Sequence, residues 1–238
     1  MSGGFGWKAR IGQLYPSGGL ADSEPQAMAP EGVQFVTTRL TFKRVGLEHG
    51  RGLVRDLESH ARLLADAEVK LIVFNCTSAS MAVGPGAINR RIEAATGIRS
   101  TTTIEAVLAA LGAARFRRLG LLTPYTEDVV QAETEFLAAA GHRVTMTRTE
   151  PCTTPVQQGL MPAARWIELA EPFAGQDIDA LFISCAGIQI APVLQQIEDR
   201  LQRPVVTSNQ AVVWHCLRVL GLPDRPKGYG ALLAGAFD

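Results

Sequence analysis

Two of the four cysteines stand in the same local setting, which makes them candidates for chemistry. Cys76 ends the apolar run LIVFNC, and Cys185 ends LFISC 109 positions further on. Small residues follow each of them, and these leave the sulfur and the backbone N–H groups accessible to a ligand. A thiolate is a nucleophile and a thiol is a proton donor. Two such sulfurs facing one cleft would act on a small substrate from opposite sides.

The alternative for both cysteines is an inert, packed thiol, because free cysteine is among the most buried residue types. We assign that role to Cys152 and Cys216, which lack the strand-end setting. Strand-end placement before a helix N-terminus favours the thiolate, so at least one of Cys76 and Cys185 is expected to be thiolate-rich near neutral pH. The sequence contains no zinc-type Cys/His spacing and no phosphate-binding glycine motif, so we expect no metal and no cofactor.

The elements that must position these cysteines alternate between strand and helix, as in parallel α/β proteins. Apolar runs predict strands at 10–16, 33–42, 70–76, 98–101 and 118–124. Leucine spacing predicts a helix within 48–68, Pro85 opens another that stops at Gly97, and Thr102-x-x-Glu105 is typical of a capping box.

The chain repeats this pattern at a nearly constant offset. RIGQLYP recurs as RLGLLTP 108 positions later, and the helix-opening prolines Pro85 and Pro192 are 107 positions apart. A strand that runs into a capped helix occupies 96–107 and again 203–214. Constant offsets through several elements indicate two copies of one structural unit.

We therefore predict an α/β fold of two pseudo-symmetric lobes, each a parallel sheet flanked by helices. Residues 1–112 with 210–238 are expected to form the first lobe and residues 113–209 the second. Ligands of open parallel sheets bind beyond the carboxyl ends of the strands. Because Cys76 and Cys185 both stand at such ends, we expect the active site in the cleft between the lobes.

Composition argues against several classes of protein. Lys+Arg and Asp+Glu both number 23, so no net charge points to nucleic acid or an anionic membrane. No apolar run is long enough to span a bilayer, and the start has no signal-peptide core, so we expect a cytoplasmic protein. Assembly into a homo-oligomer is left open.

The motifs resemble the aspartate/glutamate racemase superfamily, in the branch that holds maleate cis–trans isomerase and arylmalonate decarboxylase. The resemblance spans nearly the whole chain and rests on NCTSAS (75–80), TPYTEDV (123–129), SCAGIQ (184–189) and TSNQAVVW (207–214). It implies two pseudo-symmetric lobes, no cofactor or metal, and one cysteine from each lobe beside a small carboxylate substrate.

Carried over by resemblance, Cys76 and Cys185 match the catalytic positions, with Cys76 as the nucleophile and Cys185 as the acid/base. The residues expected to bind the substrate carboxylate are Ser17, Thr77, Ser78, Tyr125, Ala186 and Gly187. Hydroxyl groups and backbone N–H groups suit that task because they can hold developing negative charge in a water-poor cleft. The walls that select the substrate are expected from the loop 16–33 and from Met81, Val83, Ile188 and Ile190.

Two features separate the reactions of this branch. Decarboxylases carry glycine where Cys76 stands, so Cys76 favours an isomerase of a small (di)carboxylate, similar to maleate cis–trans isomerase. The loop 16–25 lacks the asparagine of the maleate isomerases and resembles the decarboxylase version. The alternatives are an amino-acid racemase of the aspartate/glutamate type, an arylmalonate-type decarboxylase with Cys185 as proton donor, and a non-catalytic carboxylate-binding protein.

Overall fold

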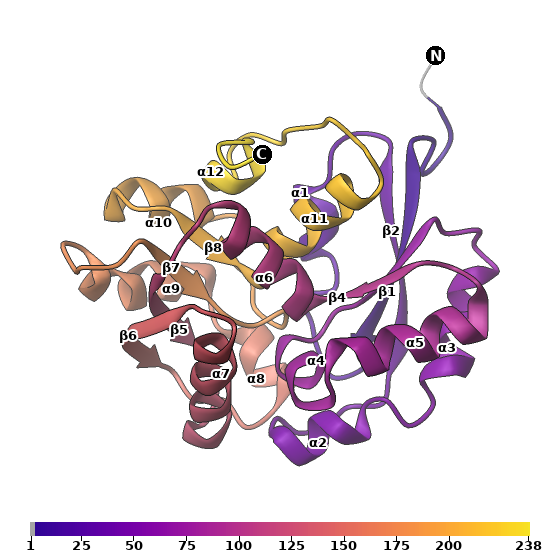
Figure 1. Cartoon of the computed structure of the whole chain (residues 1–238), viewed down its shortest axis with the longest axis horizontal. Coiled ribbons are helices and arrows are strands. Elements are labelled where there is room, and N and C mark those ends of the chain that lie inside the picture. The colour runs from indigo at the N-terminus through magenta and orange to yellow at the C-terminus, as the bar shows by residue number, and fades with distance from the viewer. Residues whose placement is uncertain (1–2) are drawn as a thin grey trace.

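Two parallel four-stranded sheets with the same strand order form the frame of the computed structural model, which describes residues 3–238 (Figure 1). The first sheet has the order β2 (Val33–Leu40), β1 (Ala9–Pro16), β3 (Leu71–Phe74) and β4 (Ser100–Thr102). The second has the order β6 (Arg143–Thr149), β5 (Arg118–Thr123), β7 (Ala180–Ile183) and β8 (Val205–Thr207). The predicted α/β fold of two similar lobes is confirmed.

The strands that lead to the two cysteines are central in their sheets. β3 and β7 each consist of four fully buried apolar residues, as expected for strands covered by helices on both faces. The edge strand β6 alternates between exposed and half-buried positions instead. Cys76 and Cys185 therefore leave the middle of each sheet at its carboxyl edge.

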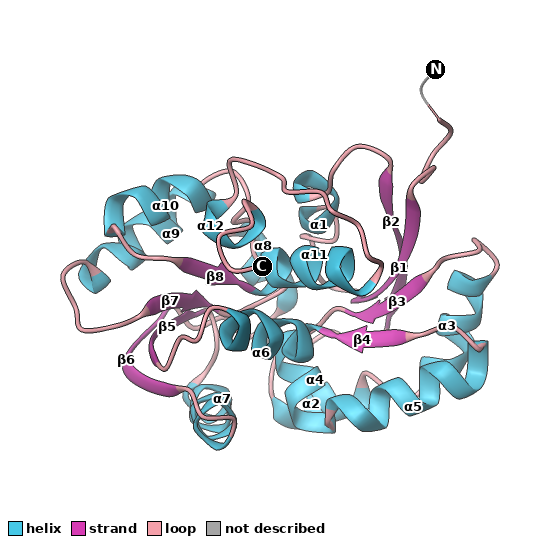
Figure 2. Cartoon of the chain, turned by 45° about the horizontal axis from the view of Figure 1, so that its top comes forward, coloured by secondary structure: helices cyan, strands magenta, loops and turns pink. Residues whose placement is uncertain are grey.

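Helices cover both faces of each sheet (Figures 1 and 2). In the first half of the chain they are α1 (Glu24–Met28), α2 (Leu47–Gly52), α3 (Leu57–Ala65), α4 (Thr77–Val83), α5 (Pro85–Thr96) and α6 (Thr103–Ala113). In the second half they are α7 (Glu127–Ala139), α8 (Pro155–Leu160), α9 (Ala163–Ala170), the 3₁₀ helix η1 (Glu171–Phe173), α10 (Leu194–Leu201), α11 (Ser208–Val219) and α12 (Gly230–Leu233). Across residues 3–238, none of them combines the length and the apolarity that a bilayer crossing requires.

The segment 48–68, predicted as one helix, is two helices with a turn between them. α2 ends at Gly52, a poor helix former, and α3 begins at Leu57. The turn brings both Leu53 and Leu57 into the core, while Leu63 stays 59% exposed. Helical spacing of leucines located the helical region but not the break within it.

The helices α6 and α11 lie against each other between the two sheets (Figure 2). Each begins directly after a short strand with a capping box, formed by Thr102 with Glu105 and by Thr207 with Gln210. The predicted box at Thr102 is confirmed. Because the two helices occupy equivalent places in the repeat, their contact lies near the pseudo-symmetry axis of the molecule.

Buried polar contacts join the two lobes. The Glu24 carboxylate of the first lobe accepts hydrogen bonds from the backbone N–H groups of Ile190 at 3.0 Å and Ala191 at 2.8 Å. The Tyr15 hydroxyl donates to the carbonyl of Ala186 at 3.2 Å. These bonds fix β1 and α1 to the loop that follows β7.

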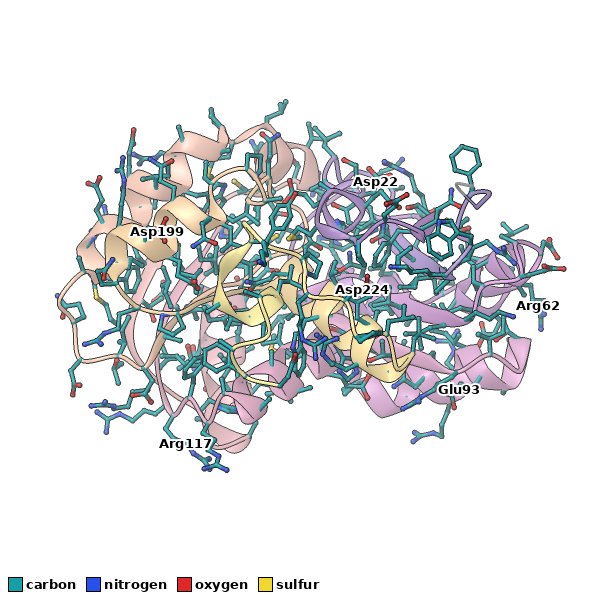
Figure 3. All side chains as sticks on the ribbon, turned by 90° about the horizontal axis from the view of Figure 1, so that it is seen from above. Asp22, Arg62, Glu93, Arg117, Asp199 and Asp224 are labelled. Carbon is teal, nitrogen blue, oxygen red and sulfur yellow. The ribbon has the colours of Figure 1, made fainter. Side chains whose placement is uncertain are left out.

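The C-terminal segment returns to the first lobe. Lys8 Nζ and Asp224 Oδ1, the latter labelled in Figure 3, form an ion pair at 2.6 Å. The Tyr229 hydroxyl donates to the Ala27 carbonyl at 2.7 Å. Both contacts agree with placing residues 210–238 in the first lobe, a division that stays a prediction.

Candidate active site

One small cavity lies between the carboxyl edges of the two sheets, and both strand-end cysteines line it. Cys76 stands two residues after β3 and Cys185 two residues after β7. The cavity is narrow: its free volume is about 20 Å³, which is space for about one water molecule. Its lining comes from Tyr15, Pro16, Gly19, Phe42, Val45, Cys76, Thr77, Ser78, Tyr125, Pro155, Gln158, Cys185, Ala186 and Gly187.

A buried polar network fixes the residue before Cys76. The Asn75 amide donates to Gln13 Oε1 at 2.9 Å and to Asn209 Oδ1 at 3.1 Å, and its oxygen accepts from the Thr103 hydroxyl at 2.9 Å. With Asn75 held from both lobes, Cys76 becomes the N-cap residue of α4 in an extended conformation. The sulfur is thereby set at the end of the central strand with little freedom.

Cys185 is held by donors and acceptors of the second lobe. Its backbone N–H donates to the Ser208 hydroxyl at 3.1 Å, and its sulfur accepts from the Gly187 N–H at 3.1 Å. The sulfur also lies 3.5 Å from Gln158 Oε1, which accepts the thiol proton. A Cβ at position 187 would approach Gln158 Oε1 to 2.9 Å, so a larger residue there would displace the Gln158 amide from its present position.

Burial dominates the acidity of both sulfurs. Loss of solvation raises the pKa of Cys185 to about 12, although the Gly187 N–H and the Tyr125 hydroxyl act in the opposite direction. Burial also raises the pKa of Cys76, against the Ala79 N–H. The expectation of a thiolate near neutral pH is therefore wrong for this structure, because desolvation outweighs the few available donors. Burial thus favours the thiol over the thiolate at both sulfurs.

The structure brings most of the predicted binding residues to this cavity. Thr77, Ser78, Tyr125, Ala186 and Gly187 all line it. Burial raises the pKa of the Tyr125 phenol well above 10, so the phenol remains a hydrogen-bond donor. The Thr77 hydroxyl donates a hydrogen bond at 2.9 Å to the hydroxyl of Ser208, which does not line the cavity. The Thr77 hydroxyl proton is therefore already used in a bond between the lobes.

Ser17 is the exception among the predicted binding residues. It is exposed and does not line the cavity. Its hydroxyl oxygen accepts from the Phe42 N–H at 3.0 Å, so its side chain is turned toward the backbone of the segment after β2. Ser17 therefore fixes Phe42, which does form a wall, and is not itself a donor to a ligand in this cavity.

The observed walls differ from the expected ones. Met81, Val83, Ile188 and Ile190 do not line the cavity; Phe42, Val45, Pro155, Gln158 and Tyr15 do. A signal for Tyr15 was present, because it ends β1 and so stands at a carboxyl end of a strand. Gln158 had none, since it is one glutamine on the short helix α8 with no partner nearby in sequence.

This arrangement places two thiols, a phenol and several backbone N–H groups around one narrow cavity. The phenol and the N–H groups can hold negative charge, while the thiols can donate protons or, once ionised, attack carbon. Phe42, Val45 and Pro155 add an apolar wall. Within residues 3–238 no three His, Cys, Asp or Glu side chains are grouped as metal ligands would be.

Comparison with known proteins identifies the family. The model of the arylmalonate decarboxylase family matches residues 11–233. The arylmalonate decarboxylase of Bordetella bronchiseptica is 30% identical over 230 residues, covering 93% of this chain and 95% of the relative. A maleate isomerase of Pseudomonas putida is 25% identical over 96% of this chain and 98% of the relative.

A solved structure has the same fold over nearly its full length. The maleate isomerase of Pseudomonas putida S16, solved as a cysteine-to-alanine variant with maleate, superimposes with a TM-score of 0.90 at 23% identity, covering 96% of this chain and 98% of that one. Family match, full-length relatives and shared fold agree with one another. The chain belongs to the arylmalonate decarboxylase family.

Proposed function

We propose that this protein is a cofactor-independent isomerase that interconverts the cis and trans forms of a small unsaturated dicarboxylate. The observation that carries the proposal is the pair of sulfurs, Cys76 and Cys185, which approach one cavity from equivalent strand ends of the two lobes. A cis–trans isomerisation uses two groups on opposite sides of the substrate. The similarity to maleate isomerases over 96% of the chain supports the same reaction.

The reacting form would hold a single proton on the two sulfurs, so the Cys76 thiol would first release its proton to water. Cys76, as thiolate, adds to one carbon of the double bond, which forms a C–S bond and moves the π electrons onto the neighbouring carbon. Cys185 donates its proton to that carbon, and the former double bond is now a single bond that can rotate. After rotation Cys185 removes a proton from the same carbon and the C–S bond breaks, which releases the trans isomer and restores both sulfurs.

The remaining lining residues would hold the charge that this chemistry creates. Addition of the thiolate places negative charge on a carboxylate in conjugation with the attacked bond. The Tyr125 phenol, the Ser78 hydroxyl and the N–H groups at the start of α4 lie on the cavity and would donate to it. Donors that are fixed before the reaction and shielded from water are the most effective kind.

A direct test is incubation of the purified protein with maleate in deuterated water, followed by proton NMR. We expect conversion of maleate to fumarate without any added metal or cofactor. Aspartate, glutamate, hydantoins and phenylmalonate in parallel incubations separate the other reactions. Deuterium exchange at Cα with inversion would identify a racemase, and ligand binding with no turnover of any compound would identify a binding protein.

Decarboxylation of an arylmalonate is the second candidate, and two observations favour it. The relative at 30% identity is an arylmalonate decarboxylase. The apolar wall of Phe42, Val45 and Pro155 suits a pocket that destabilises a carboxylate. In that reaction the carboxylate leaves as carbon dioxide, and Cys185 protonates the enediolate that remains. Stereospecific loss of carbon dioxide from phenylmalonate analogues, with maleate unchanged, would replace the isomerase proposal.

Two broader proposals accompany this one. We infer that the kinship extends to the aspartate/glutamate racemase superfamily, which the repeat of two lobes with one strand-end cysteine each supports. We also propose the cytosol as the place of action. All four cysteines are free thiols, as is usual in a reducing compartment.

A further inference from the structure

Gln158 is the one residue of the cavity with a buried donor that the protein leaves unused. It is 4% exposed and lines the cavity from α8. Its Nε2 has no hydrogen-bond partner among residues 3–238, whereas its Oε1 accepts from the Cys185 thiol at 3.5 Å. A buried N–H group without a partner is destabilising, so native proteins rarely retain one without a reason.

The surroundings determine what the free N–H group can do. Oε1 is engaged by the Cys185 sulfur, which is itself fixed by the Gly187 N–H. The lining of the cavity also includes Pro155, Phe42 and Val45, whose side chains contain no hydrogen-bonding atom. A ligand group next to the Gln158 amide therefore finds one donor on an otherwise apolar wall. An acceptor there satisfies the amide, and an aryl or alkyl group leaves it unsatisfied.

We infer that Gln158 determines specificity, by donating from Nε2 to a second carboxylate, or another strong acceptor, on the substrate group that lies beside Cys185. This inference rests on the proposed function, because a dicarboxylate has one carboxylate for the donors around Tyr125 and another for Gln158. Through Oε1 the same side chain orients the Cys185 thiol proton. Gln158 thus selects a doubly anionic substrate and positions the proton donor that serves it.

A binding experiment tests this assignment without requiring turnover. Calorimetric titration of the wild-type protein and of Gln158→Met with succinate and with butyrate compares two carboxylates with one. Methionine keeps the length of the side chain and removes its amide. We expect wild type to bind succinate at least fivefold more tightly than butyrate, and the variant to lose at least fivefold in succinate affinity with little change for butyrate.

Each alternative result has a defined meaning. A change of less than fivefold in succinate affinity, or no preference of wild type for succinate, overturns the role of Gln158 even if maleate is isomerised. Absence of isomerisation with the expected binding pattern leaves Gln158 as a dicarboxylate selector and overturns the proposed reaction alone. The exposed Gln131 on α7, changed to Met, is the matched control. Should Gln158→Met not fold, Gln158→Glu retains the shape and replaces the donor by a charge that repels the second carboxylate.

The positioning role has its own readout. In Gln158→Met the Cys185 thiol lacks its acceptor, so its rate of alkylation by iodoacetamide should follow a different pH profile from that of wild type. A purely structural role would change the thermal stability and leave this profile unmoved.

Discussion

Glu133 and Ser184, the residue that precedes Cys185 in the chain, share a buried hydrogen bond. The Ser184 hydroxyl donates to Glu133 Oε1, while Oε2 of the same carboxyl has no partner among residues 3–238. Burial raises the pKa of Glu133 to about 7, and the Ser184 hydroxyl opposes the shift. The chain therefore keeps a carboxyl group that changes charge near neutral pH next to the residue that carries the second sulfur.

Stability should fall with rising pH because of this group. Its pKa is about 7 when folded and 4.5 without the fold, so the folded state holds the proton more tightly. The contribution is fully present below pH 4.5 and is lost as pH rises through about 7. Glu133→Gln should remove this pH dependence of the free energy of unfolding, whose total amplitude is on the order of 3 kcal/mol. Urea unfolding at pH 5 and pH 8 measures it, and an equal slope in wild type and variant would contradict the assignment.

The two thiols should react faster as the pH increases. Burial raises the pKa of Cys185 to about 12 and also raises that of Cys76, so little thiolate exists at neutral pH. The rate of alkylation by iodoacetamide at both residues should rise about tenfold per pH unit above neutrality. Peptide mapping by mass spectrometry after labelling between pH 7 and 9 follows each cysteine separately. A plateau already reached at pH 7 would show that a thiolate forms despite the burial.

Replacing Cys76 by glycine should separate the two candidate reactions. Isomerisation calls on two opposed groups and should be abolished, whereas decarboxylation of an arylmalonate needs one proton donor and should persist or emerge. Cys185→Ala should reduce both reactions by at least about 10²-fold, as is typical for loss of a positioned acid or base. The assay is NMR with maleate and with an arylmalonate. Full isomerase activity in Cys76→Gly would exclude Cys76 as the nucleophile.

Ser208→Ala should destabilise the protein and disturb the site together. The Ser208 hydroxyl accepts from Thr77 at 2.9 Å and from the Cys185 N–H at 3.1 Å, so its loss leaves two buried donors without an acceptor. We expect a loss of about 1–3 kcal/mol in the free energy of unfolding, with a fall in kcat/KM. The exposed Ser59→Ala serves as control and should change stability by less than about 0.5 kcal/mol. A neutral Ser208→Ala would mean that water replaces the hydroxyl.

Local sequence patterns were sufficient to predict much of the fold. The repeat offset depends on strand ends and helix caps, which are short-range features, so it predicted two similar sheets and the strand-end places of Cys76 and Cys185. No bounds could be predicted for the helix α4 after Cys76, because its small residues show no apolar period. The break between α2 and α3 was missed because the leucine spacing continues through it, whereas the low helix propensity of Gly52 and the burial of Leu53 together favour the turn.

Side-chain partners at the site required the fold itself. Ser17 follows a strand end and looked suited to bind a ligand, yet its hydroxyl is directed to the backbone of Phe42. Gln158 approaches Cys185 from a distant helix, over a glycine at position 187 that leaves room for its amide. The acidity of the sulfurs also escaped prediction, since it depends on the extent of burial rather than on neighbouring residues in the sequence.

The small volume of the cavity limits the rate at which the protein can turn over a substrate. A space that holds about one water molecule cannot admit a dicarboxylate until a wall moves. The buried hydrogen bonds of Glu24 to Ile190 and Ala191 join the lobes. Phe42 and Val45 belong instead to a surface segment. Its contacts with the second lobe include the hydrogen bond from the Val45 N–H to the Thr153 carbonyl at 3.0 Å. Turnover can be no faster than the opening of such a wall, however fast the sulfurs react. In the proposed reaction the same narrow walls would keep bulk water away from the negative charge on carbon, so the barrier that slows entry would also protect the intermediate.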